Sequence, residues 1–183
     1  MRLALALLLA ACGGSAPRDP IAHHAPDDRR IVERFEIRGV SAARADELRA
    51  LVRPHIAPGI ELTSVRYEAA HEAILSDYLD RGHVEAKLTW PDFDAVKGPF
   101  ALVLTISEGP RYTVAALAVA GVPEADRPRY VALSPLRVGE PYSRTKLATW
   151  VQAVADAVGG KAQPEITIDR TTTTISLTVH AAK

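Results

Sequence analysis

The stretch LVLTISEGPRYTVAALAVAGV, residues 102–122, contains two strand patterns separated by a Gly109-Pro110 turn. Apolar residues alternate with other residues from Leu102 to Ile106, which is the period of a strand with one face on a core. The second pattern ends in Leu117-x-Val119-x-Gly121-Val122, where a glycine allows the chain to turn. We therefore expect one structural unit to close before this turn and another to open after it.

The same signals occur upstream. Phe35-x-Ile37-x-Gly39-Val40 matches residues 117–122 position for position. Residues 59–63 and 139–143 are each a loop that leads into a helix with a hydroxyl N-cap, and apolar residues flank both caps as in a hydrophobic staple. Two copies of one unit explain this repetition better than a single domain.

Composition alone leaves the number of domains open. The chain has 183 residues, of which 48% are hydrophobic and 24% charged, and its formal net charge is zero. These values are ordinary for a globular protein. The balanced charge gives no electrostatic reason to expect nucleic acid as a partner.

Residues 1–12 resemble a bacterial lipoprotein signal. One basic residue precedes an apolar run that is too short to span a bilayer as a mature helix, and Leu9-Ala10-Ala11 leads to Cys12, the only cysteine. The resemblance implies that Cys12 is lipidated and becomes the mature N-terminus, so that acyl chains tether the protein to a membrane. Gly13 replaces the aspartate associated with inner-membrane retention, which favours the periplasmic face of the outer membrane. The alternative is a plain secretory peptide in which Cys12 is incidental.

Residues 13–30 are rich in Gly, Ser, Pro and charge and have no apolar period, so we expect a flexible tether. Four residues in this region could be considered as metal ligands: His23, His24, Asp27 and Asp28. Nothing nearby would hold these side chains in place. We therefore expect a solvated linker and no metal site.

Residues 31–111 predict the order β-α-α-β-β. The first strand places Ile31, Phe35 and Ile37 inward, and Ser41 begins a helix that ends before Pro54. A second helix covers about 64–81. The apolar faces expected for the two helices are Ala45, Leu48, Leu51 and Val52, and then Val65, Ala69, Ala73, Ile74 and Tyr78. The second strand is predicted at 84–90 and the third at 100–107.

Residues 112–183 predict the same order with a compressed first helix at 124–133. The long helix covers 143–158 and ends at Gly159-Gly160. A closing hairpin carries Ile166 and Ile168 on one strand and an alternating apolar strand after it.

The chain resembles a tandem of POTRA (polypeptide-transport-associated) domains, the periplasmic modules of outer-membrane barrel assembly factors. Three segments carry the resemblance: Phe35-x-Ile37-x-Gly39, the run from Ala73 to Ala86, and Ile106-x-Glu108-Gly109-Pro110-x-Tyr112 with the strand after it. The resemblance covers residues 31–183. It implies an α+β fold of two tandem β-α-α-β-β units, each a three-stranded mixed sheet with the third strand central and two helices on one face. The structural motif residues it implies are Gly39, Tyr78, Gly82, Glu108, Gly109, Pro110 and Gly121.

The chain differs from barrel assembly factors because no barrel follows the POTRA-like units and a lipid-anchor pattern precedes them. What the resemblance still implies is binding of other envelope proteins, meaning barrel assembly or secretion components and unfolded outer-membrane clients. We expect a non-catalytic scaffold lipoprotein that acts in outer-membrane protein assembly or protein export. The alternative is a structural or envelope-organising lipoprotein, related to division, that uses the same fold.

The sequence contains no phosphate-binding glycine loop, no nucleophile elbow and no zinc-type His/Cys spacing. His71 and Glu72 are neighbours on a predicted helix, so their side chains point in different directions. We therefore expect no enzyme activity, no cofactor, no metal and no small-molecule substrate.

The second strand is the expected binding site, because it lies at an edge when the third strand is central. Its residues are Val84, Glu85, Ala86, Lys87, Leu88, Thr89 and Trp90. An extended client could add there as a further strand. The alternative is a merely solvated edge, since outward charges such as Glu85 and Lys87 also protect edges from pairing. Other candidate sites are the groove between helix and sheet and the second unit's edge at 165–169.

Overall fold

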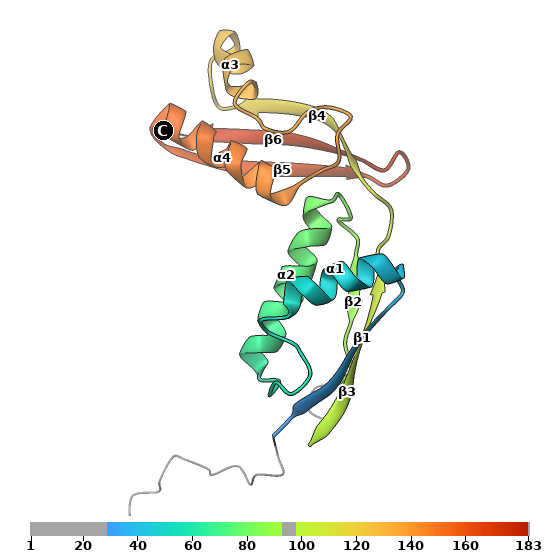
Figure 1. Ribbon diagram of the computed structural model, residues 1–183. Coiled ribbons are helices and arrows are strands. Elements are labelled where there is room, and N and C mark those ends of the chain that lie inside the picture. The colour runs from blue at the N-terminus through green and yellow to red at the C-terminus, as the bar shows by residue number, and fades with distance from the viewer. Residues whose placement is uncertain (1–28, 93–97, 183) are drawn as a thin grey trace, which may run out of the picture.

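The structure of this chain contains two three-stranded sheets that follow one another along the molecule (Figure 1). It is a computed structural model, and it describes residues 29–92 and 98–182. Each sheet is mixed and has helices on one of its faces. The predicted α+β class with a tandem β-α-α-β-β order is confirmed.

In the first unit (residues 31–111), strand β3 (Pro99–Ser107) lies at the centre of the sheet. Strand β1 (Ile31–Arg38) pairs with it in parallel, and β2 (Lys87–Thr89) pairs antiparallel on its other side. Helices α1 (Ala42–Val52) and α2 (Ser64–Asp80) cover one face (Figure 1). The third strand is therefore central, as the resemblance to POTRA domains implied.

The second unit (residues 112–183) repeats this topology. Strand β6 (Thr174–Ala182) is central, with β4 (Thr113–Ala120) parallel on one side and β5 (Lys161–Asp169) antiparallel on the other. The long helix is α4 (Arg144–Val158). A 3-10 turn, η2 (Glu124–Asp126), and the short α3 (Arg127–Val131) form the compressed first helix that was predicted.

The three longer helices begin at hydroxyl residues, as predicted. In each case the side-chain oxygen accepts a hydrogen bond from a backbone N–H in the first turn, which satisfies a donor that has no partner inside the helix. These caps are Ser41 for α1, Thr63 for α2 and Ser143 for α4.

Repeated glycines end the first strand of each unit. Gly39 and Gly121 both have positive φ, at 86° and 78°. A Cβ atom at either position would lie only 2.0 Å from a backbone carbonyl oxygen of the central strand, that of Ile106 or of Ala181. No other residue fits so close an approach, so the repeated motif has the same steric cause in both units.

Each unit has its own cluster of buried apolar side chains. Tyr78, Leu102 and Leu104 belong to the first cluster, and Trp150 and Leu177 to the second. Val84, which precedes β2 in the first unit, instead packs against the second cluster. The two units therefore share apolar contacts where they meet.

Four expected inward residues are placed differently by the structure, one of them Ala69, whose neighbour Ala70 is the buried alanine of α2. In β1 the buried residue is Val32 rather than Ile31, because a bulge between Val32 and Arg34 shifts the alternation by one position. Leu51 and Val65 are 42% and 76% exposed. Leu51 lies beside the buried face of α1 and Val65 lies in the first turn of α2, beyond the core.

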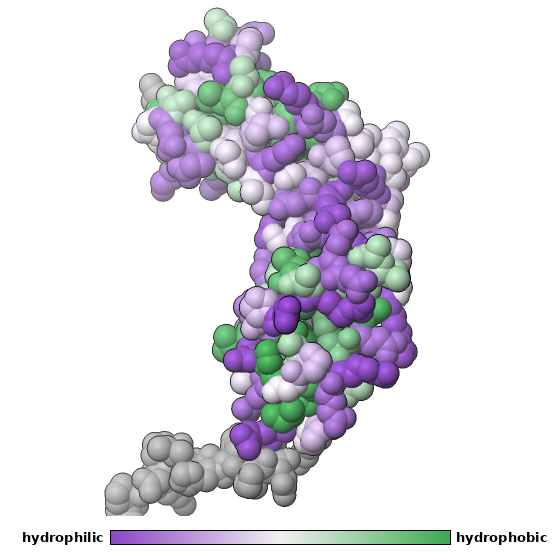
Figure 2. Space-filling view, in the orientation of Figure 1, coloured by the Kyte–Doolittle hydropathy of each residue, from purple (hydrophilic) through white to green (hydrophobic). Residues whose placement is uncertain are grey.

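Within residues 29–92 and 98–182, no helix is both long enough and apolar enough to cross a membrane. Figure 2 shows that hydrophilic residues cover much of the visible surface where the two units meet. The shared apolar contacts therefore lie beneath a polar surface.

Candidate functional site: the free edge of the first sheet and the joint between the units

The predicted edge strand of the first sheet is present, but it is shorter than expected. Strand β2 contains only Lys87, Leu88 and Thr89, which pair with Ser107, Ile106 and Thr105 of β3 in that order. The side chains of Lys87 and Thr89 are exposed, and Leu88 packs against the first core. No described residue pairs with the other side of β2.

The expected strand from Val84 to Trp90 is therefore wrong at both ends. Turns occupy the segment before Lys87, where the Ala86 N–H donates to the His83 carbonyl oxygen. The backbone leaves the sheet there because the Val84 side chain packs against the second unit. Trp90 lies just after β2 and donates its indole N–H to Nδ1 of His71 at 3.0 Å.

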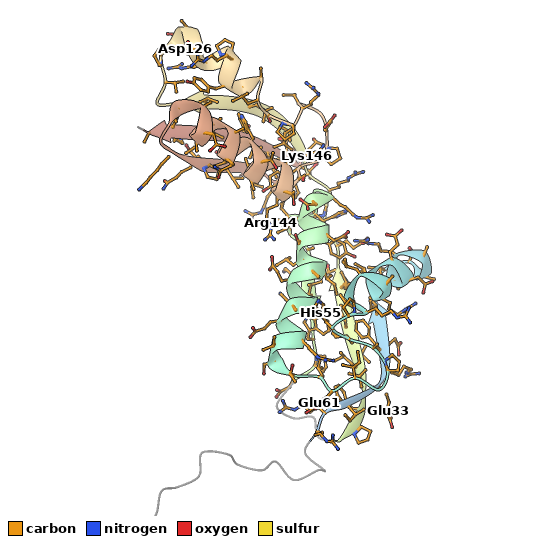
Figure 3. All side chains as sticks on the ribbon, turned by 60° about the vertical axis from the view of Figure 1, so that its left-hand side comes forward. Glu33, His55, Glu61, Asp126, Arg144 and Lys146 are labelled. Atoms are coloured by element: carbon orange, nitrogen blue, oxygen red, sulfur yellow. The ribbon has the colours of Figure 1, made fainter. Side chains whose placement is uncertain are left out.

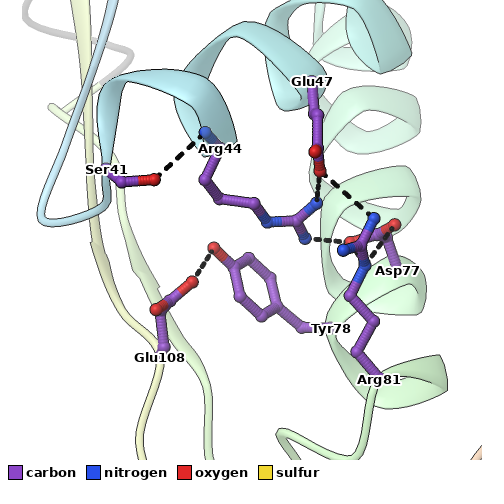
Figure 4. Close-up of polar contacts among 7 residues, drawn as sticks. All are labelled: Ser41, Arg44, Glu47, Asp77, Tyr78, Arg81 and Glu108. Atoms are coloured by element: carbon purple, nitrogen blue, oxygen red, sulfur yellow. Dashed lines mark hydrogen bonds and ion pairs between the residues drawn. The ribbon is translucent and has the colours of Figure 1, made fainter.

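The motif residues Tyr78 and Glu108, which the sequence separates by thirty positions, are in contact. The buried Tyr78 hydroxyl donates to Oε1 of Glu108 at 2.9 Å (Figure 4). Burial and the Glu108 carboxylate raise the pKa of Tyr78 to about 12. Because Glu108 follows β3 directly, this bond ties the middle of the core to the start of the connection between the units.

A set of charged residues around Tyr78 was not expected from the sequence. The Arg44 guanidinium lies over the Tyr78 ring, 4.9 Å from its centroid, and pairs with Asp77 and Glu47 (Figure 4). Arg81 pairs with the same two carboxylates. The network joins α1 to the C-terminal end of α2, and so it fixes the end of α2 that faces the second unit.

Gly82 and Tyr112 form the backbone contact at the joint between the units. The Tyr112 N–H donates to the Gly82 carbonyl oxygen at 2.8 Å, and the Tyr112 carbonyl oxygen accepts from the Tyr142 N–H at 3.0 Å. Gly82 has a φ of 90°, and a Cβ there would lie 2.7 Å from the Tyr112 oxygen. The motif glycine is therefore required by the close approach of the connecting segment.

A carboxylate of the first unit lies at the N-terminus of the long helix of the second. Oδ1 of Asp80 accepts from the Ser143 hydroxyl at 2.8 Å and from the Thr145 N–H at 2.7 Å, while Oδ2 accepts from the Thr145 hydroxyl at 2.7 Å. Burial alone would raise the pKa of Asp80, but these bonds and the charge of Arg144 hold the pKa below its ordinary value. Asp80 thus supplies a cap to α4 in addition to Ser143, where the helix dipole favours a negative charge.

Two ion pairs also cross the joint. Arg144 donates to Glu72 at 2.6 Å and to the Ser76 hydroxyl at 3.2 Å, and Figure 3 shows Arg144 beside the end of α2. On another side, Nε of Arg170 donates to Oε1 of Glu85 at 2.6 Å. The Arg170 bond lowers the pKa of Glu85, and the nearby Tyr112 hydroxyl adds to this effect.

A cleft of about 570 Å³ lies between β2 and the second unit's hairpin. Its lining includes Glu85 and Lys87 from the edge strand region, Gly109 and Pro110 from the connecting turn, and Arg170 from the hairpin. The predicted edge and the predicted turn motif therefore meet at one place on the molecule. Arg170 was not predicted as a residue of this site, because no local sequence pattern indicates that it lies there.

The remaining sequence hypotheses concern metal and lipid. Cys12 and the four candidate metal ligands of the tether, His23, His24, Asp27 and Asp28, lie outside the described residues. Among the side chains that the structure describes, no group of three or more His, Cys, Asp or Glu residues could hold a metal ion. What the described site offers is hydrogen-bonding backbone and paired charges, which are suited to holding another polypeptide.

Of the comparisons with known proteins, the one with solved structures identifies the fold. No protein-family model and no curated protein matches the chain. Among solved structures, domains POTRA3-5 of BamA from Haemophilus influenzae match 91% of this chain and 68% of that one, with 16% identity and a TM-score of 0.62.

Two further structures match in the same way. BamA from Haemophilus ducreyi lacking POTRA domains 1–3 matches 82% of this chain but only 29% of that one, with 14% identity and a TM-score of 0.63. POTRA1-2 of the periplasmic domain of Omp85 from Anabaena matches 86% of this chain and 98% of that one, with 11% identity and a TM-score of 0.51. At these identities the likeness concerns the fold alone, and the chain has a tandem POTRA-like fold.

Proposed function

We propose that this chain is a non-catalytic scaffold that binds other proteins of the cell envelope in outer-membrane protein assembly or protein export. The observation that supports this best is the free edge of β2 in a POTRA-like unit, beside the cleft at the joint. A free strand edge offers backbone N–H and C=O groups to any extended segment. Such binding depends little on the partner's sequence, which suits a protein that accepts varied clients.

The location belongs to the same proposal. We place the protein at the periplasmic face of the outer membrane, anchored through acyl chains on Cys12 and a tether of residues 13–30. The two POTRA-like units, 31–111 and 112–183, would then reach partners at a distance set by the tether. Support comes from the signal-like pattern of residues 1–12 and from structural likeness to a periplasmic domain.

The binding edge is tested by a proline at Lys87 with Lys87→Gln as its matched control. Both variants lose the charge, but only the proline removes a backbone N–H from β2. The probe is an unfolded outer-membrane barrel protein held in urea and diluted into the assay. We expect Lys87→Pro to bind it less well than Lys87→Gln, with an unchanged helical circular-dichroism signal in both.

If Lys87→Pro unfolds, photo-crosslinking gives a second measurement. A photo-crosslinking residue is placed at Thr89, and a second variant carries it at Arg137 in the second unit for comparison. Equal binding by a folded Lys87→Pro variant, or equal crosslinking at the two positions, would exclude this edge. Attention would then move to the groove between helix and sheet or to β5. Septal localisation of the protein in cells would favour the envelope-organising alternative over assembly or export.

A further inference from the structure

The short length of β2 requires something more than backbone pairing to hold a partner. In an antiparallel ladder only every second residue offers its N–H and C=O groups to the free edge. Because β2 consists of Lys87, Leu88 and Thr89 alone, it can form few hydrogen bonds with an added strand. A partner must therefore gain contacts beyond the ends of β2.

The second unit closes one end of this edge. The cleft of about 570 Å³ is lined by Lys87 from the first unit and by Arg170 from the second, and Arg170 lies just after the end of β5. An extended segment that pairs with β2 and continues in the direction of Glu85 enters this cleft. Residues of both units would then contact the same partner.

The joint holds the two walls of the cleft in one arrangement. Asp80 at the N-terminus of α4, the Arg144–Glu72 pair and the Tyr112 backbone bonds all cross between the units. The Glu85–Arg170 pair joins two residues that line the cleft. These contacts involve α2, the connecting segment and the hairpin, so the two units are held at more than one place.

The charges that line the cleft favour an acidic group on the partner. Lys87 and Arg170 are positive and Glu85 is the one negative side chain among the lining residues. Lys87 forms no ion pair within the described part of the chain. Asp169 lies next to Arg170, but its carboxylate already accepts the backbone N–H groups of Thr171 and Thr172 in the hairpin turn.

We propose that β2 and the cleft form one composite docking surface, which binds an extended polypeptide segment that carries an acidic side chain next to its strand-pairing residues. Lys87 and Arg170 would hold the carboxylate, with Arg170 able to share its donors between that group and Glu85. Recognition thus involves both units. This proposal rests on the proposed function, since it names the partner that the free edge accepts.

The test uses synthetic peptides of alternating valine and threonine bounded by serine. Two peptides carry an aspartate, one near each end, and two matched peptides carry asparagine at the same positions. We expect one aspartate peptide to bind the full chain about two- to five-fold more tightly than its asparagine match, as measured by calorimetry, and this preference to vanish at high salt. The peptide end at which aspartate improves binding then reports the direction in which the partner strand runs.

Three variants test which residues of the chain cause the preference for aspartate. Arg170→Gln should reduce the preference for aspartate, because Lys87 alone then contacts the carboxylate, and should weaken the asparagine peptide less than the aspartate peptide. Arg137→Gln, at an exposed arginine elsewhere in the second unit, should change neither. Lys87→Pro should weaken the binding of all four peptides. Equal binding of aspartate and asparagine peptides by the wild-type chain overturns the composite surface but leaves the β2 edge standing. Failure of all four peptides to bind, or full binding by Lys87→Pro, overturns both proposals.

Discussion

The Tyr78 side chain links the first core to the connection between the units. The residue is 1% exposed, its ring packs beneath Arg44, and its hydroxyl donates to Glu108. The residue therefore has an apolar role and a polar role that can be separated by substitution. The two roles differ in expected size, because cavity formation in a core costs more than loss of one hydrogen bond.

We expect Tyr78→Phe to lower the free energy of unfolding by about 1.5–3 kcal/mol, since the hydroxyl bonds to a carboxylate. Tyr78→Ala should cost about 3–5 kcal/mol because it also leaves a cavity. Urea denaturation followed by tryptophan fluorescence measures both, and Trp90 of the first unit and Trp150 of the second both contribute to the signal. If the two variants have equal stability, the ring contributes nothing and this account of the core fails.

At this scale the sequence predicted the motif residues but not their partners. Tyr78 and Glu108 could be named from the E-G-P and tyrosine pattern, and they do meet. The pairing of Arg44 with Asp77 depends on how α1 crosses α2, which no local pattern specifies. The same limit applies to Arg170 and Glu85, which are eighty-five residues apart.

Among the elements, α4 is the one that depends most on another unit. Its first turn receives hydrogen bonds from the Ser143 side chain and from Asp80 at the end of α2. The C-terminal end of one helix thus faces the N-terminal end of another, where their dipoles attract. A change at Asp80 should therefore act on both the helix and the joint.

We expect Asp80→Ala to destabilise the second unit by about 0.5–2 kcal/mol, the usual cost of losing a helix N-cap. It should also broaden the distribution of distances between two spin labels, one at Glu68→Cys in α2 and one at Ala148→Cys in α4. Double electron–electron resonance measures this distribution in a Cys12→Ser background. Asp156→Ala, at the other end of α4, is the control. If the distance distribution of Asp80→Ala is as narrow as that of the wild type, the remaining contacts hold the joint by themselves.

The strand predictions failed where tertiary packing changes the backbone. The period-2 pattern at Val84–Trp90 is present, yet only its centre is a strand because Val84 is drawn into the second core. The bulge in β1, repeated between Val114 and Ala116 in β4, also leaves no clear mark in the sequence. Helix positions were predicted more accurately, because caps and stop signals are local.

For the whole molecule, the joint should respond to pH. The pKa values of Asp80 and Glu85 are held below their ordinary values of 3.8 and 4.5 by bonds that cross between the units. The stabilisation they give is therefore complete above those values and is lost as the pH falls through the lowered ones. The joint should therefore loosen before either unit unfolds.

The same pair of spin labels measures this effect. We expect the distance distribution to be narrow at neutral pH and to broaden below about pH 3.8, while the helical circular-dichroism signal persists. An Asp80→Asn variant should show much less pH dependence, since it keeps the shape but cannot titrate. If the helical signal is lost at the same pH at which the distance distribution broadens, the joint opens and the units unfold together.

A final prediction concerns the anchor expected at Cys12. Cys12→Ser removes the thiol that acyl chains would modify, so the precursor should be processed poorly and the protein should no longer fractionate with membranes after a salt and carbonate wash. Ser15→Ala, three residues further on, is the control and should leave fractionation unchanged. Membrane association of Cys12→Ser equal to the wild type would contradict the lipoprotein proposal.

The position of Asp80 has a consequence for the order in which the chain acquires its structure. The Thr145 amide that Asp80 binds lies sixty-five residues later in the chain, so the first unit is synthesised well before α4. Starting a helix is its unfavourable step. A carboxylate already fixed on a finished neighbour makes that start easier, and the arrangement favours folding from the N-terminus onward, with the first unit acting as a template for the second.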